Sequence, residues 1–316
     1  MVGGRGHYLD KATDGRFFIS GSYALLDAAG EWFYNSSDRA LYAWMPDGAA
    51  PAGRVGVKTR DYCVDVDASA QQVTVANLSF LGCTFALRNC SGCVVQDVQL
   101  HYPTTTRHIA TRAVASGGAP PPTTLVAGND SLVEKLHLQG SATGGVKLIG
   151  WRNTLREALV EDVCWLGSLD YPAVEIGFGE QQPTLLAASS GWRSVYGDDN
   201  VVTRVTVRRM GNAGIVTSQL SNNVSLALVS EVGLIGLDHA GIHADNSPAT
   251  CMDWTLPQAQ RANCVKIWHH NWVHDAREKC MRGDDFNLNL TAHHNVLWNC
   301  GMPHDDSNTA GAEPRT

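Results

Sequence analysis

The sequence predicts an all-β protein in which short strands stack as a parallel β-helix. Three observations predict it: a motif that recurs after a fixed interval, short β-rich runs of alternating polarity, and the lack of a long segment with helical periodicity. Charged residues are only 17% of the chain, and glycine is abundant, with 31 residues among 316. This composition argues against a coiled coil, a helical bundle and a highly charged disordered chain.

The recurring motif is His-His-Asn, which ends at Asn271 and again at Asn295, 24 residues later. A period in the low twenties, with several short strands in each period, is typical of a β-helix whose coils form successive rungs. Strands of adjacent rungs lie about 4.8 Å apart. We therefore expect Asn271 and Asn295 to stack as an asparagine ladder at a rung corner, bonded to each other and to the backbone. An up-and-down barrel would not place the two motifs in register.

The N-terminal part of the chain predicts a different element, a β-hairpin. Residues 24–34 and 40–46 are expected to pair across the polar turn 35–39, and Pro46 ends the second strand. Later strands are predicted where short β-rich runs lie between Gly, Asn, Asp or Ser residues. These runs are residues 73–80, 93–100, 201–207, 223–229, 265–273 and 290–298.

The elements divide the chain into three parts: a hairpin and entry region (residues 1–60), β-helix rungs (61–303) and a polar tail (304–316). No rung precedes the hairpin, and no capping element is apparent after the last rung. A β-helix needs its open ends covered. We therefore expect the chain to be a fragment, and its missing rungs could hold catalytic groups.

Two stretches resemble a known superfamily. The first is the hairpin Gly-Glu-Trp-Phe-Tyr (30–34) with Leu-Tyr (41–42), and the second is the rung sequence 271–296. Both are similar to the right-handed parallel β-helix proteins of the pectin-lyase-like superfamily, over roughly residues 20–300. The resemblance implies a right-handed coil, an extracellular or cell-surface location and a polysaccharide or oligosaccharide partner. It leaves the reaction open, because this fold hosts hydrolases, lyases, epimerases and adhesins.

Aligning the rungs by their glycine–isoleucine cores brings candidate site residues together. Residues 241–245 match 280–284, and 214–218 and 173–177 fit the same frame. Because alternate side chains of a strand face opposite ways, Ile242 and Met281 should point into the coil. Two outward columns result: Glu175, Val216, His243 and Arg282 form one, and Gly177, Ser218, Asp245 and Asp284 form the other.

Asp245 and Asp284 are the predicted catalytic residues. On adjacent rungs their backbones would lie about 5 Å apart, so the two carboxylates would share a proton or a cation. A carboxyl pair with separated pKa values is what glycoside hydrolysis requires. We expect His243, Arg282, Glu175 and Trp254 to bind the substrate, Trp254 from the insertion 247–263. In the competing interpretation, both aspartates only end strands.

Two other functions stay open. One is a polysaccharide lyase or uronan epimerase, in which Arg282, Lys279 and His243 neutralise the uronate and take its C5 proton. Calcium held by Asp245 and Asp284 would then assist; the hydrolase needs no cofactor. The other is a non-catalytic glycan-binding or cell-surface module.

Composition limits partners and location. The net charge of -7 argues against a nucleic-acid partner. The sequence lacks a run of about 18 apolar residues, so we expect no membrane span. We expect a monomer. The N-terminus has no apolar signal segment, yet six glycosylation sequons occur. They would be glycan sites in a secreted protein and chance matches in a cytosolic one: Asn35, Asn77, Asn89, Asn129, Asn223 and Asn289.

The nine cysteines and the clustered histidines complete the candidates. We expect most cysteines to be buried thiols, with Cys251 and Cys264 the best disulfide pair. His269, His270, His274, His293 and His294 lie in two adjacent rungs. Because neighbours in a strand face opposite ways, His269 and His270 should not join one site, and no metal site is predicted.

Overall fold

The computed structural model describes residues 21–67, 69–105, 123–165, 171–177, 199–217, 221–236, 240–244, 265–284 and 289–301. The chain divides into two compact units, Met1–Lys58 and Thr59–Thr316. Within the described ranges the regular structure is β-strand, apart from one short 3-10 helix, η1 (Tyr23–Leu25). The predicted all-β class is therefore confirmed.

The first unit contains the predicted hairpin. Strands β1 (Trp32–Asn35) and β2 (Ala40–Ala43) pair antiparallel across a turn. Asp38 organises this turn, because its carboxylate accepts hydrogen bonds from the Ala40 amide and the Tyr42 hydroxyl. The first strand is shorter than predicted, because residues 23–30 form η1 and a turn instead.

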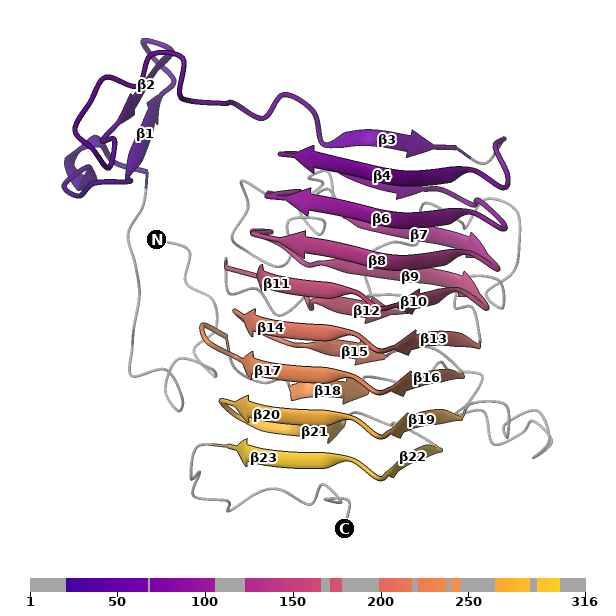
Figure 1. The fold of residues 1–316 in the computed structure, drawn as a ribbon. Coiled ribbons are helices and arrows are strands. Elements are labelled where there is room, and N and C mark those ends of the chain that lie inside the picture. Colours follow the sequence, from indigo (N-terminus) through magenta and orange to yellow (C-terminus); the bar gives the residue numbers. More distant parts are fainter. Residues whose placement is uncertain are drawn as a thin grey trace. The chain divides into compact units, whose positions relative to one another are not determined.

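The second unit consists of two parallel sheets (Figure 1), and every strand pairing recorded in them is parallel. The eight-stranded sheet contains β3 (Tyr62–Val66), β5 (Thr84–Leu87), β7 (Thr124–Asn129), β9 (Val146–Trp151), β12 (Val174–Ile176), β15 (Ile215–Thr217), β18 (Ala240–Ala244) and β21 (Lys279–Gly283).

The thirteen-stranded sheet contains the remaining strands of this unit. They are β4 (Thr74–Leu81), β6 (Val94–His101), β8 (Leu132–Gln139), β10 (Thr154–Arg156), β11 (Leu159–Val163), β13 (Asn200–Thr203), β14 (Thr206–Met210), β16 (Asn222–Ser225), β17 (Leu228–Val232), β19 (Lys266–His269), β20 (Trp272–Ala276), β22 (Leu290–His293) and β23 (Val296–Cys300).

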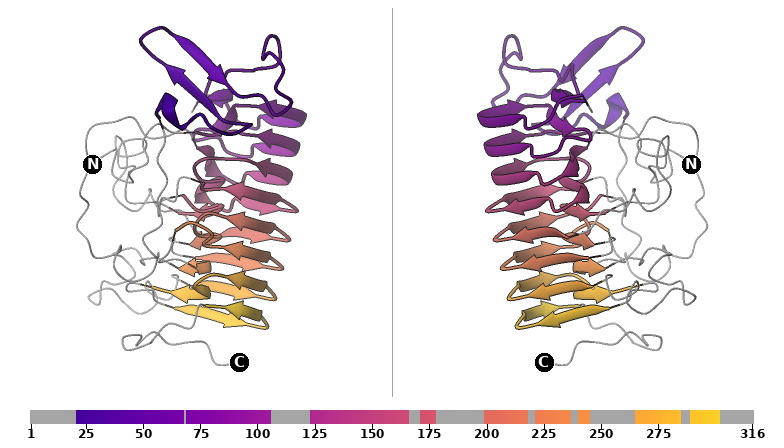
Figure 2. Two further views of the ribbon diagram at one scale, coloured as in Figure 1. Left: turned by 90° about the vertical axis from the view of Figure 1, so that its left-hand side faces the viewer. Right: turned by 90° about the vertical axis from the view of Figure 1, so that its right-hand side faces the viewer.

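The chain alternates between the two sheets. From β9 it enters the thirteen-stranded sheet as β10 and β11, then returns as β12 beside β9, and later passes repeat this order. Each pass adds strands next to those of the previous pass, so the strands lie in successive layers (Figure 2). Thr291 pairs with Ile267, which gives the 24-residue interval predicted from the histidine motif.

A sharp corner bends the thirteen-stranded sheet at the same register position in each described layer, and from β10 onward it separates two strands. The corner residues adopt a left-handed backbone, as at Arg204 (φ 52) between β13 and β14. The predicted strand 201–207 is therefore broken in two. The residues at this corner are Asn77, Asp97, Lys135, Glu157, Arg204, Leu226, His270 and His294.

The predicted asparagine ladder follows this corner. The Asn271 side-chain amide donates to the Asn295 Oδ1 atom and to the Val224 carbonyl, at 3.0 Å each. The Asn295 amide donates in turn to the Trp268 carbonyl. This prediction is confirmed. A second ladder, which the sequence analysis missed, joins Asn153 to Asn200 at the corner before β10 and β13.

The core contains side chains from both sheets, including Leu148 and Ile242 from the eight-stranded sheet and Val160 and Val229 from the other. Alternate residues of the eight-stranded sheet face away from this core. There a second, smaller buried cluster forms from Ala86, Leu125, Ala127 and Ile149. The outward face of this sheet is thus partly buried.

Most of the cysteines form disulfides, so the expectation of buried thiols was wrong. The pairs are Cys63–Cys83, Cys90–Cys93 and Cys280–Cys300, with Cα–Cα distances of 5.6, 6.0 and 5.2 Å that suit a disulfide. Cys164 is a buried thiol. Cys251 and Cys264 lie outside the described residues.

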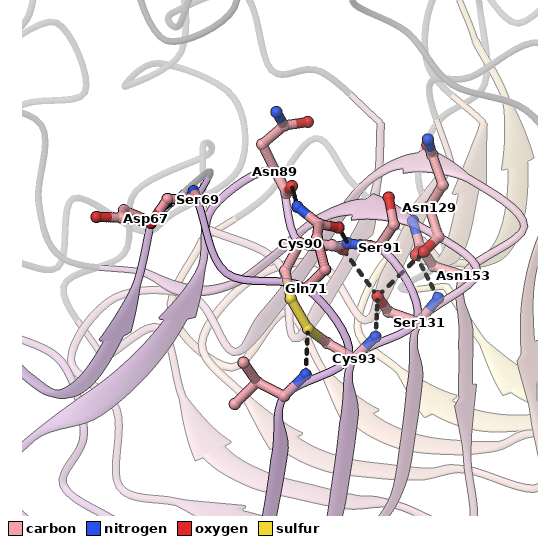
Figure 3. Close-up of a disulfide and its surroundings, with 11 residues drawn as sticks. Asp67, Ser69, Gln71, Asn89, Cys90, Ser91, Cys93, Asn129, Ser131 and Asn153 are labelled. Carbon is pink, nitrogen blue, oxygen red and sulfur yellow. Dashed lines mark hydrogen bonds between the residues drawn. A yellow bond between two sulfur atoms is a disulfide. The ribbon is translucent and has the colours of Figure 1, made fainter.

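The fully buried Cys90–Cys93 bridge lies at the turn before β6, where hydrogen bonds connect it to the neighbouring layers (Figure 3). The Ser131 hydroxyl donates to the Cys90 carbonyl and accepts from the Cys93 amide, and the Ser131 amide donates to Asn153. The C-x-x-C spacing alone could not reveal this bridge, because stacking of the layers supplies Ser131 from a distant part of the sequence.

Candidate functional site

The candidate site begins as one column of side chains on the outward face of the eight-stranded sheet. Direct register partners run from β5 to β21 in the order Ala86, Leu125, Lys147, Glu175, Val216, His243 and Arg282. Asp65 of β3 precedes Ala86 in this column and forms an exposed ion pair with Arg88. Ala86 and Leu125 belong to the small apolar cluster, and ionisable side chains return at Lys147. The register predicted for Glu175, Val216, His243 and Arg282 is the register observed.

Side-chain directions along β18 and β21 also follow the prediction. Ile242 is in the main core, and Met281 packs against it. Because directions alternate along a strand, the next residues, His243 and Arg282, face the opposite way. Both are still well covered: the His243 side chain is 3% exposed and that of Arg282 is 20% exposed.

His243 and Arg282 meet at the carboxylate of Asp284. The His243 Nε2 atom lies 3.5 Å from Asp284 Oδ2, and an Arg282 terminal nitrogen lies 2.6 Å from the same oxygen. The Asp284 amide donates to the Ala244 carbonyl at 2.9 Å, which holds the carboxylate just beyond the end of β21. Three reactive side chains from two layers therefore converge at one point.

Other predicted site residues are not placed. Asp245, Trp254 and Ser218 lie outside the described residues, so the Asp245–Asp284 pair stays a prediction. Gly177 follows β12, and its amide donates to the Leu148 carbonyl in the neighbouring layer.

Glu175 forms its ion pair with Lys147, which lies in the neighbouring layer on the side of the column away from His243. The Lys147 Nζ atom lies 2.8 Å from the Glu175 carboxylate, and both side chains are largely buried. The sequence analysis missed Lys147. Extending the rung alignment by one more layer, from residues 173–177 to 145–149, would have placed it opposite Glu175.

The geometry defines what each group can do. Arg282 supplies a planar cationic fork that binds carboxylates and hydroxyls. Asp284, as the acceptor of that fork, is equipped to act as a base or nucleophile. His243 can donate or accept a proton through Nε2, with a tautomer that its neighbours determine. Together they combine anion binding with proton transfer.

The histidines near the last layers correct one prediction. His269 and His270 were expected to face opposite ways, but their Nδ1 atoms lie 2.8 Å apart. The left-handed backbone of His270 turns its side chain onto the side of its neighbour. Burial, followed by the charges of the adjacent histidines, lowers the pKa of His269.

In the described ranges, no group of three or more His, Cys, Asp or Glu side chains is positioned to hold a metal ion. No helix within those ranges has the length and apolar character needed to cross a bilayer.

No protein-family model matches the chain, and no curated protein or solved structure matches it significantly. The function is therefore argued from the site alone.

Proposed function

We propose that the chain is a right-handed parallel β-helix, similar in architecture to the pectin-lyase-like superfamily, and a secreted glycoside hydrolase that acts on a polysaccharide. The observation that carries the proposal is the convergence of His243, Arg282 and Asp284 on a largely buried outward face. Ionisable groups that are buried together on a face otherwise lined by apolar side chains are typical of functional sites.

The contacts support the proposed roles of Asp284 and Arg282, and the role of Asp245 rests on the rung alignment of the sequence. Asp284 acts as base or nucleophile, Arg282 orients it and binds substrate hydroxyls, and Asp245 serves as the acid. Water is the co-reactant: the anomeric carbon gains its hydroxyl, and the departing sugar oxygen gains the acid's proton. His243 binds the substrate beside Asp284, and Glu175 with Lys147 extends the polar column.

Export is supported by two features. Three disulfides join described residues, and disulfides persist mainly in oxidising compartments. The six sequons fit the same location.

A lyase is the second candidate, because one observation favours it. His243 and Arg282 are direct register partners, which places a proton acceptor beside a cation. Lyase chemistry needs this combination: the base takes the C5 proton, the cation neutralises the uronate, and the leaving oxygen departs with a proton.

The test is a polysaccharide panel incubated with the wild type, Asp284→Asn and the control Asp162→Asn. Asp162 lies on the thirteen-stranded sheet and pairs with Arg209, away from the site residues. New reducing ends without ultraviolet absorbance, lost about a hundredfold in Asp284→Asn only, would support the hydrolase. New absorbance, removed by His243→Gln or by a chelator, would support the lyase. Binding without any product, equal in all variants, would contradict both and favour a glycan-binding module.

A further inference from the structure

Four histidines form a cluster where β19 and β22 reach the corner. The histidine cluster consists of His269 and His270 in one layer and His293 and His294 in the next. The His269 ring stacks on that of His293, with centroids 5.2 Å apart and 9° between the planes. The His270 and His294 rings stack similarly, at 4.9 Å and 2°. The cluster is therefore an ordered two-by-two array.

Within each layer the two rings meet through the same atoms. The Nδ1 atoms of His269 and His270 are 2.8 Å apart, and so are those of His293 and His294. Both layers share this geometry because His270 and His294 have the same left-handed backbone, with φ values of 55 and 53. Each of the two layers therefore contains one pair of neighbouring Nδ1 atoms.

The cluster is accessible to solvent. His270, His293 and His294 are exposed, and His269 is half-buried. A ligand can therefore approach the Nδ1 edges of both pairs without displacing the core.

The spacing of the nitrogens selects a coordination geometry. Two imidazole nitrogens bound to one ion at about 2.0–2.1 Å are about 2.9 Å apart at a right angle and about 3.3 Å apart at a tetrahedral angle. The observed 2.8 Å is a hydrogen bond between the two rings, and it is also close to the spacing of neighbouring ligands of a square-planar or octahedral ion. Metal binding replaces this hydrogen bond, and each ring then carries its proton on Nε2, which leaves both Nδ1 lone pairs free. Copper(II) and nickel(II) prefer such geometry with imidazole ligands, and copper(II) binds more tightly.

We propose that each histidine pair is a two-nitrogen chelating site for copper(II), with water completing the coordination sphere. Each ring turns about its Cβ–Cγ bond so that both Nδ1 lone pairs converge on the ion. The stacking distance of about 5 Å keeps the pairs separate, so each ion takes two histidine ligands. Two dications this close repel, so the second ion binds more weakly than the first.

The experiment titrates untagged, chelator-stripped protein with copper(II) at neutral pH, followed by calorimetry and electron paramagnetic resonance. The wild type should bind a first ion with hyperfine splitting from two imidazole nitrogens, and a second ion more weakly. Zinc(II) should bind less tightly than copper(II).

The decisive variant is His270→Asn with His294→Asn. Asparagine tolerates a left-handed backbone, so the corner should be kept while each layer retains one histidine. Copper affinity should fall roughly tenfold or more, and the two-nitrogen signal should disappear. His294→Asn alone should leave one pair and one ion with two nitrogens. His274→Asn, a histidine in the same layers but outside the cluster, should bind copper as the wild type does.

Two results would overturn the proposal. One is a wild type that shows no two-nitrogen copper signal. The other is a folded double variant, with an unchanged circular dichroism spectrum, that binds copper as tightly as the wild type. Either would mean that copper binds elsewhere or not at all.

Discussion

The outward faces of the two sheets carry similar ion pairs in different surroundings. Lys147–Glu175 on the eight-stranded sheet and Arg156–Glu134 on the thirteen-stranded sheet each join direct register partners, with an N–O distance of 2.8 Å. The two cations differ in exposure: the Lys147 side chain is 12% exposed and that of Arg156 is 41% exposed. Stacking of layers therefore places ion pairs on both faces, and of these two pairs the one on the eight-stranded sheet has both members largely buried.

This difference supports the proposal that the outward face of the eight-stranded sheet binds a ligand. A hydrated surface pair contributes little to stability, and a buried pair must overcome the loss of solvation of both ions. An apolar pair would fill the Lys147–Glu175 site at lower cost, as Leu125 does one layer earlier. Retaining charge there, in the same column as His243 and Arg282, is what we expect of a binding face.

The largest effect should come from the buried pair. Lys147→Met leaves the Glu175 carboxylate buried without its cation and should lower the free energy of unfolding by about 3 kcal/mol. A double-mutant cycle with Glu175→Gln should give a coupling of about 2 kcal/mol. The same cycle on Arg156 and Glu134 should give less than about 1 kcal/mol. Equal couplings from denaturant unfolding of the two sets would remove the distinction between the faces.

Arg282 offers the next comparison, inside the site. Arg282→Met leaves Asp284 three-quarters buried beside His243, and should destabilise the fold by about 2 kcal/mol. Its counterpart is Arg208→Met on the thirteen-stranded sheet, where Arg209 still pairs with the same Glu161 carboxylate. That variant should cost less than about 1 kcal/mol. A more harmful Arg208→Met, measured by thermal unfolding, would contradict the assignment of the buried face.

The response to acid should isolate the two carboxylates of the thirteen-stranded sheet, Glu161 and Asp162. The Arg209 guanidinium lowers the pKa of Asp162, although burial opposes it. Burial alone would raise the pKa of Glu161, but hydrogen bonds from His137, Arg208 and Arg209 outweigh it and the pKa is lowered.

Groups with a lowered folded-state pKa stabilise the protein above their ordinary pKa of about 4, and this contribution is lost as the pH falls through the lower folded value. Glu161→Gln with Asp162→Asn should therefore flatten the fall in unfolding free energy below pH about 4, by less than about 1 kcal/mol for each group after solvent screening. A slope identical to that of the wild type, followed by urea unfolding across this range, would show that these carboxylates do not contribute.

The register of neighbouring strands and the 24-residue repeat were predictable from the sequence. The left-handed corner of the thirteen-stranded sheet was not. The matching of residues 241–245 with 280–284, and the ladder of Asn271 on Asn295, depend on local motifs that recur in the chain. The corner has a left-handed backbone at eight positions, and four of them hold residue types that do not favour that conformation: Lys135, Glu157, Arg204 and Leu226. Tertiary stacking imposes it, so single-strand alternation failed at His269 and His270.

The site was predictable to the same extent. Stacking by register brought His243 over Arg282, because both lie in a motif with recognisable glycine–isoleucine spacing. Disulfides between separate strands were not predictable, since Cys63–Cys83 and Cys280–Cys300 depend on which strand ends meet. Spacing along the chain does not report that proximity.

The smallest effect should have the opposite sign and lie at the corner. Leu226 is half-exposed and has φ 54, a conformation that is unfavourable for a residue with a branched, apolar side chain and acceptable for asparagine. Leu226→Asn should therefore raise the unfolding free energy by about 0.5 kcal/mol, because it relieves strain and removes little buried surface. Leu226→Ala keeps the strain and should not stabilise, which separates backbone relief from the loss of an exposed apolar group. Every substitution described above on the buried face should destabilise. A destabilised Leu226→Asn would mean that the leucine side chain, and not the left-handed backbone, determines stability at this corner.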